Sequence, residues 1–193
     1  MYKKLTFIAL FCVLLLKSFC TFAQDGTTTS ATNSSSTTIT LGITEVSLLK
    51  ASADIINLQL NQQDAGLSIE SSASDSTARL LMSSVISTSM TRTLSAKITA
   101  GTVPPGTHLE LSALQPNSNF AGETGTLIIP TTLDGTDRPI ITNIASCYSG
   151  RGAADGYPLK FSYTLDVNPA TYGTLRATTG AQIVVTFTLT AIQ

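Results

Sequence analysis

Several residue types on which enzymes and sugar-binding proteins depend are scarce in this chain. Tryptophan is absent, aromatic residues make up 6% of the 193 residues, and the single histidine is His108. One histidine and no G-x-S-x-G motif leave no set of residues for a serine hydrolase. A groove that cleaves or holds sugars usually offers aromatic platforms, so their shortage disfavours a glycosidase and a lectin. We therefore expect no enzyme and no cofactor.

A long hydrophobic run is also missing, and the one apolar stretch present has the features of a secretory signal peptide. Residues 1–23 start with Lys3 and Lys4, continue with an apolar run of about 12 residues, and end in a small-x-small motif. This run is shorter than the ~20 residues that a membrane-spanning helix needs. We predict cleavage before Gln24 and export to the periplasm, the cell surface or the extracellular space. A lipid anchor is disfavoured, because no Leu-small-small pattern precedes Cys12 or Cys20.

Charge and cysteine are both sparse in the exported part. Loss of three lysines with the leader leaves eight of the eleven basic residues against twelve acidic ones, a net charge of about −4. This balance argues against nucleic acid and against electrostatic binding to anionic membranes as partners. Cys147 is the one cysteine left, so no intramolecular disulfide is expected and the fold must depend on its core.

What the chain does have is serine, threonine and alternating patterns. Residues 24–37 are a low-complexity Ser/Thr-rich stretch that we expect to be a linker. Residues 38–193 repeatedly alternate apolar and polar side chains with no helical period, which predicts an antiparallel β-sandwich. Turn signals separate the runs, among them Pro104-Pro105-Gly106. The expected strands lie within residues 38–46, 53–60, 92–100, 108–114, 125–130, 139–146, 159–167 and 182–192.

Two stretches resemble known families. RTLSAKITAGTVPPGTHLELSA, residues 92–113, is similar to a stretch of secreted fimbrial-subunit-like β-sandwich proteins of bacteria. Residues 140–165 and the closing VVTFTLTA resemble a family of exported β-sandwich proteins of the Bacteroidota. The shared positions are glycines, turns and strands. The resemblance therefore implies an Ig-like or fimbrial-subunit-like topology and carries over no catalytic residue.

The alternation of Ile39, Leu41 and Ile43 allows two interpretations. The segment is either the chain's own first strand, which we favour, or a donor strand that completes the sheet of a neighbouring copy. The resemblance to pilins implies a glycine fourteen residues from the C-terminus and an aromatic next to last. Gly180 fits the first position, whereas Ile192 replaces the aromatic.

The passage SCYSGRGAADGYPL, residues 146–159, contains the most promising loop. Its Gly150, Arg151, Gly152 and Asp155 nearly form a dinucleotide fingerprint, but the third glycine is misplaced and a strand pattern follows instead of a helix. We expect a connection between two strands whose glycines admit positive φ. If any loop binds a partner, this is the candidate, with Arg151 at its centre.

Other candidate chemistry is weaker. Cys147 lacks a nearby general base and is expected to be a buried hydrophobe. His108 and Glu110 share a strand face but are too few for a zinc site. Asp134 and Asp137 lack the spacing of a calcium loop, and a turn explains them. No metal is therefore expected.

The sequence thus predicts an exported, non-enzymatic structural or adhesive surface protein. A fimbria-like subunit that assembles by pairing strand edges is one form of it, with self-association as the interaction. The alternative is a stand-alone extracellular binding module for a glycan or a protein ligand. We expect no nucleic acid partner and no integral membrane span.

Overall fold

The computed structural model describes residues 35–52, 55–166, 172–178 and 180–192. The predicted leader and residues 24–34 of the predicted linker lie outside these ranges. Among the described residues, those from Gly42 onward belong to one compact unit, and residues 35–41 belong to a separate one. In the described residues, no helix has the length and apolar character needed to cross a membrane.

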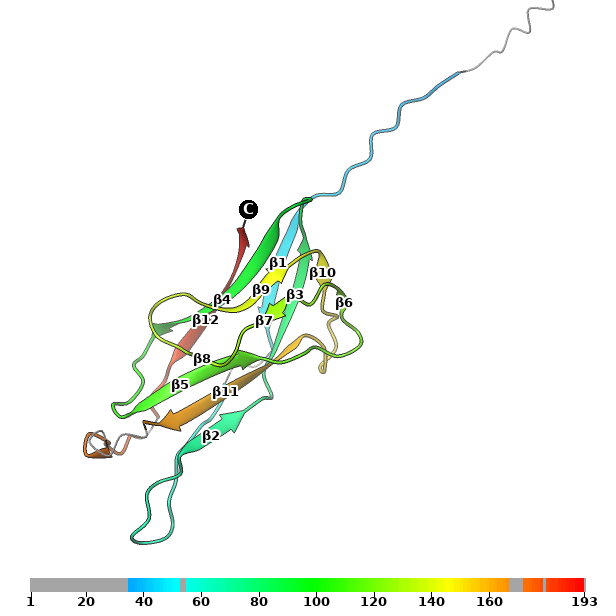
Figure 1. The fold of residues 1–193 in the computed structure, drawn as a ribbon. Helices are drawn as coiled ribbons and strands as arrows, with labels where there is room; N and C mark the ends of the chain where they lie inside the picture. The colour runs from blue at the N-terminus through cyan, green and yellow to red at the C-terminus, as the bar shows by residue number, and fades with distance from the viewer. Residues whose placement is uncertain (1–34, 53–54, 167–171, 179, 193) are drawn as a thin grey trace, which may run out of the picture. The chain divides into compact units, whose positions relative to one another are not determined.

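The compact unit is built from two antiparallel sheets (Figure 1). The first sheet follows the order β6-β10-β3-β11-β5-β8, with β1 on β3 and β2 on β11. The second follows the order β12-β4-β9-β7. The strands are β1 (Val46–Ala51), β2 (Ser72–Asp75), β3 (Arg79–Val85), β4 (Thr91–Ala100), β5 (Thr107–Ala113), β6 (Ala121–Gly122), β7 (Thr126–Leu127), β8 (Thr131–Thr132), β9 (Arg138–Ile144), β10 (Cys147–Tyr148), β11 (Tyr157–Leu165) and β12 (Val184–Ile192).

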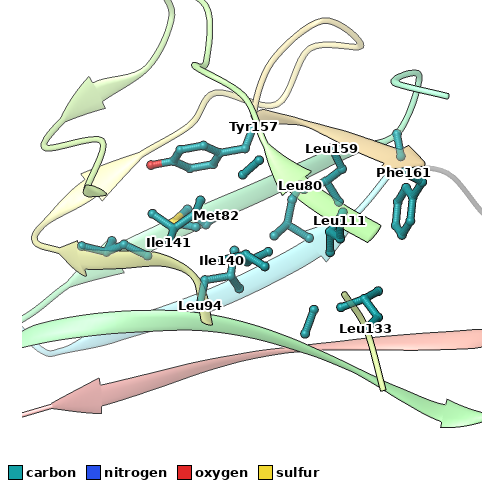
Figure 2. Close-up of a cluster of buried hydrophobic side chains, with 14 of the residues drawn as sticks. Leu80, Met82, Leu94, Leu111, Leu133, Ile140, Ile141, Tyr157, Leu159 and Phe161 are labelled. Carbon is teal, nitrogen blue, oxygen red and sulfur yellow. The ribbon is translucent and has the colours of Figure 1, made fainter. Parts of the chain in front are cut away.

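The core lies between the sheets, and both supply it through their inward positions (Figure 2). Alternation along β3 buries Leu80, Met82 and Ser84, and alternation along β11 buries Tyr157, Leu159 and Phe161. The second sheet contributes Leu94 and Ala96 from β4 and three isoleucines from β9. Burial of these side chains drives the packing, because each removes apolar area from water.

The predicted all-β sandwich is confirmed. The strands expected at 92–100, 108–114, 139–146, 159–167 and 182–192 correspond to β4, β5, β9, β11 and β12. The predicted turn at Pro104–Gly106 also forms. Gly106 has φ of 78°, and the Thr107 N–H donates to the Pro104 carbonyl at 3.2 Å.

Two expected strands are wrong. Residues 38–45 are in no strand, and the first strand begins only at Val46. Residues 55–60 alternate between exposed and half-buried, and Ile56 and Leu58 pack on the core, yet this segment joins no ladder. The alternating pattern therefore predicts which side chains face inward. It does not show whether the backbone pairs with a neighbouring strand.

Candidate functional site

The loop between β10 and β11 is closed by its own main chain. Ser149 donates from its N–H to the Met82 carbonyl at 3.0 Å, and its hydroxyl accepts from the Met82 N–H at 2.9 Å. The Gly156 N–H then donates back to the Ser149 carbonyl at 3.1 Å. These bonds fix both ends of residues 149–156 to β3. The expected strand-to-strand connection is thus a well-anchored loop with a defined shape.

Asp155 holds this loop from inside. The Asn117 and Asn119 side-chain amides donate to its Oδ1 at 2.9 and 2.8 Å, and the Gly152 N–H donates to its Oδ2 at 2.7 Å. A Cβ on Gly150 would lie only 2.4 Å from Oδ2, so the glycine at φ of 77° makes room for the carboxylate. Asp155 is thereby buried and turned inward, away from any ligand on the loop surface.

These donors stabilise the ionised carboxylate. The amides of Asn117 and Asn119, followed by the backbone N–H of Gly152, lower the pKa of Asp155 from 3.8 to about 2. A carboxyl whose pKa is lower in the folded state stabilises the protein above its unfolded pKa. That contribution is lost as the pH falls from about 4 to about 2.

We therefore expect Asp155→Asn to lower the melting temperature at pH 6. The difference from the parent protein should shrink between pH 4 and pH 2, where the parent loses its own carboxylate. Thermal unfolding followed by circular dichroism across this range measures the effect. Asp64→Asn, at an exposed position, serves as the control and should show no such convergence. A pH-independent difference for Asp155→Asn would refute the carboxylate anchor.

Arg151 stands at the exposed tip of this anchored loop. Together with Gly150 it borders a shallow hollow of about 180 Å³ on the first sheet, which is also lined by Leu48, Leu49, Lys50, Leu81, Met82 and Ser83. The sequence singled out Gly150, Arg151, Gly152 and Asp155. The structure places Arg151 and Gly150 at the hollow and uses Gly152 and Asp155 to hold the loop.

The remaining candidates are occupied by structural contacts. Burial raises the pKa of the Cys147 thiol to about 11, so it stays protonated within the core cluster. His108 Nδ1 lies 2.7 Å from Asp166 Oδ1, and its Nε2 lies 3.7 Å from Glu110 Oε1. Asp134 binds Arg138 and Thr136, and Asp137 pairs with Lys97 at 2.9 Å. No group of three metal-ligating side chains occurs in the part of the chain that the structure describes.

The segment before β1 is an alternating apolar stretch that stands in solvent. Ile39, Leu41 and Ile43 are 75%, 89% and 88% exposed. Just after them the chain is fixed, because Glu45 Oε1 accepts from the Ser87 N–H at 3.2 Å and Glu45 Oε2 lies 4.0 Å from Arg92 Nη2. Arg92 also donates to the Val46 carbonyl at 3.4 Å. The favoured prediction, that residues 39–43 form an internal strand, is therefore wrong for these residues.

The last strand leaves an edge without a partner. β12 pairs with β4 over its whole length, and no other strand of the described residues pairs with its opposite edge. Its sequence, VVTFTLTAI, contains no charge and no proline. Val185, Phe187 and Leu189 face the core but remain only half-buried. We call this side the open edge of β12. The sequence does not reveal this edge, because an alternating pattern does not say which strands are outermost.

Comparisons with family models, with curated proteins and with solved structures find no match for this chain.

Proposed function

We propose that this chain is an exported structural or adhesive protein whose copies assemble by strand addition. In this proposal, residues 38–44 of one copy pair with the open edge of β12 in the next. The leader-like residues 1–23 support export, and the poverty of catalytic residue types supports a structural role. The proposal places the protein at the bacterial surface because of its resemblance to fimbrial-subunit-like proteins.

The open edge of β12 is the observation that carries the proposal. Exposed edges are templates for pairing with another chain, and proteins usually protect them with charges, prolines or bulges. β12 has nine residues, and its one irregularity lies at its first pair, Val184/Val185. An added strand would also cover the half-buried Phe187 and Leu189. The edge thus offers both main-chain hydrogen bonds and apolar area to a partner.

The exposed segment of the same chain has the matching chemistry. In residues 38–44 the apolar Ile39, Leu41 and Ile43 alternate with small polar or glycine positions, without a charge. A strand of this kind presents one apolar face to the core and one threonine-rich face to water, as β12 does. This similarity favours the donor interpretation of the segment.

A second copy is favoured over the segment's own β12. Glu45 is held at the start of β1, and only Thr44 separates it from Ile43. Ile39, Leu41 and Ile43 nevertheless stand exposed, and residues 38–44 pair with no strand of their own chain among the described residues. The open edge is left for another molecule.

Removal of residues 24–43 tests the proposal. The full exported chain should form concentration-dependent oligomers in sedimentation velocity and electron microscopy, and the truncated protein should remain monomeric. The truncation keeps Glu45 and therefore the anchor of β1. Equal assembly by the two proteins, or a monomeric full-length chain at every concentration, would refute strand addition.

A further inference from the structure

We infer that the hollow beside Arg151 binds a six-membered ring that carries a carboxylate, namely a hexuronic acid residue of an acidic glycan. This inference goes beyond strand addition. It concerns the outer face of the first sheet and uses no residue of β12.

Strand register places the lining residues of β1 and β3 side by side, next to Tyr148 of β10. Leu48 of β1 lies opposite Ser83 of β3, and Lys50 lies opposite Leu81. Tyr148 of β10 pairs with Ser83 from the other side. Residues opposite one another share a face of the sheet, so Leu48, Ser83 and Tyr148 form a row across it. Leu48 and Tyr148 are 64% and 58% exposed, so this row presents apolar side chains to solvent.

The size of the hollow suits a single ring. The hollow is open to solvent, and its volume of about 180 Å³ leaves room for one ring that lies on the sheet. Among the described residues, no aromatic side chain lines the hollow; in place of the usual aromatic platform, Leu48 and Leu81 give it an apolar floor on which the C–H face of a sugar ring can pack. The Ser83 hydroxyl offers a hydrogen-bond partner for a ring hydroxyl.

The positive charges beside the hollow favour a ring that carries an acidic group. Lys50 and Arg151 both border the hollow, and no acidic side chain within the described ranges pairs with either. Asp155, the nearest acid in sequence to Arg151, is committed to Asn117 and Asn119 inside the loop. The chain as a whole is acidic, so two unpaired cations at one hollow form a local positive site. A guanidinium binds a carboxylate through two parallel hydrogen bonds.

The position of the hollow on the face of the sheet limits how a peptide could bind there. The hollow lies over β1, β3 and the β10–β11 loop, where β3 is already paired on both sides. An extended peptide binds a sheet through unpaired main chain at an edge. β3 offers none here, and only the outer side of β1, which pairs with β3 alone among the described strands, is free. A ring that lies on the face of β1 and β3 is recognised by side chains instead. Because Asp155 anchors the loop, Arg151 is presented from a fixed platform, which reduces the entropy lost on binding.

NMR titration of the isotope-labelled protein tests the inference with two sugars. Methyl glucuronide should shift the amide signals of Leu48, Lys50 and residues 150–152. Methyl glucoside, which has a hydroxymethyl group in place of the carboxylate, should shift them at least about tenfold more weakly. Arg151→Gln and Lys50→Gln should each raise the Kd for the glucuronide about tenfold or more. Lys160→Gln removes an exposed cation elsewhere on the same sheet and should leave the Kd unchanged.

Three results would overturn the inference. The first is the absence of any shift at 20-fold molar excess of an oligomeric uronate such as a glucuronate-containing hexasaccharide. The second is an equal loss of binding in Lys160→Gln, which would show diffuse charge attraction. The third is binding of a tetraglutamate peptide at these residues without binding of the uronate, which would assign the surface to an acidic protein.

Discussion

Replacement of Tyr157 by alanine is expected to cost about 3–5 kcal/mol of unfolding free energy, the usual range for removal of a buried aromatic side chain. Tyr157 is fully buried at the start of β11, and its ring meets that of Phe120 edge-on with centroids 5.2 Å apart. Its hydroxyl donates to the Thr124 carbonyl at 2.7 Å. Burial raises the pKa of this phenol, so the group remains a hydrogen-bond donor through the neutral range. Urea unfolding followed by far-UV circular dichroism measures the cost.

Tyr157→Phe is the matched control for the hydrogen bond. It keeps the ring and its contact with Phe120 but leaves the Thr124 carbonyl without this donor. The expected loss is about 1–2 kcal/mol, since a buried acceptor is left unpaired. If Tyr157→Ala and Tyr157→Phe unfold at the same urea concentration, the ring does not contribute to the core in the way that the structure indicates (Figure 2).

Replacement of Ile39, Leu41 and Ile43 together by aspartate should lower self-association about a thousandfold or more. On the proposed assembly these side chains enter the half-buried row along β12, and an unpaired charge placed there costs several kcal/mol. Each 1.4 kcal/mol is a factor of ten in affinity. Sedimentation velocity over a concentration series gives the change.

The control carries the same charges on the opposite face. Replacement of Thr38, Thr40 and Thr44 by aspartate leaves the apolar side chains intact. In an added strand, the side chains at these three positions point to solvent. Association should then stay within about tenfold of the parent protein at moderate salt. Equal loss in both variants would mean that general repulsion, rather than insertion of an apolar face, governs assembly.

The sequence predicted strands where one face is apolar and the other polar. β4, β5, β9, β11 and β12 meet that condition, because each lines the core on one side. The sequence does not predict β3, although this strand lies at the centre of the first sheet. Its neighbouring Leu80 and Leu81 interrupt the alternation, and its third inward position, Ser84, is a polar residue that is buried. Two-residue strands such as β10 are too short to leave any pattern.

The sequence correctly predicts that the loop connects two strands. The separate roles of its residues can be seen only in the structure. Asp155 is bound by Asn117 and Asn119, which are 38 and 36 residues away in the chain. No local sequence pattern shows such a contact. From the sequence alone, Asp155 is therefore a candidate binding residue like Arg151. The hollow likewise depends on the register of β1 against β3, which brings Lys50 within the same lining as Arg151.

The segment with Ile39, Leu41 and Ile43 is the reverse case, because it has an alternating pattern but forms no strand. The pattern is that of a strand with one buried face, yet the structure leaves these side chains exposed and the segment unpaired among the described residues. Local sequence specifies an extended segment with an apolar face. Whether another strand pairs with it depends on which edges are available, and in the proposed assembly the acceptor is the open edge of β12.

The most direct test of strand addition is an NMR titration of the isotope-labelled protein lacking residues 24–43 with an unlabelled peptide of residues 36–45. Strand addition should give saturable shifts concentrated in Val184–Ile192 and slower amide hydrogen exchange along that strand. The peptide with aspartate at 39, 41 and 43 should have no such effect. Shifts confined to other strands, or none at millimolar peptide, would contradict the open edge of β12 as the acceptor.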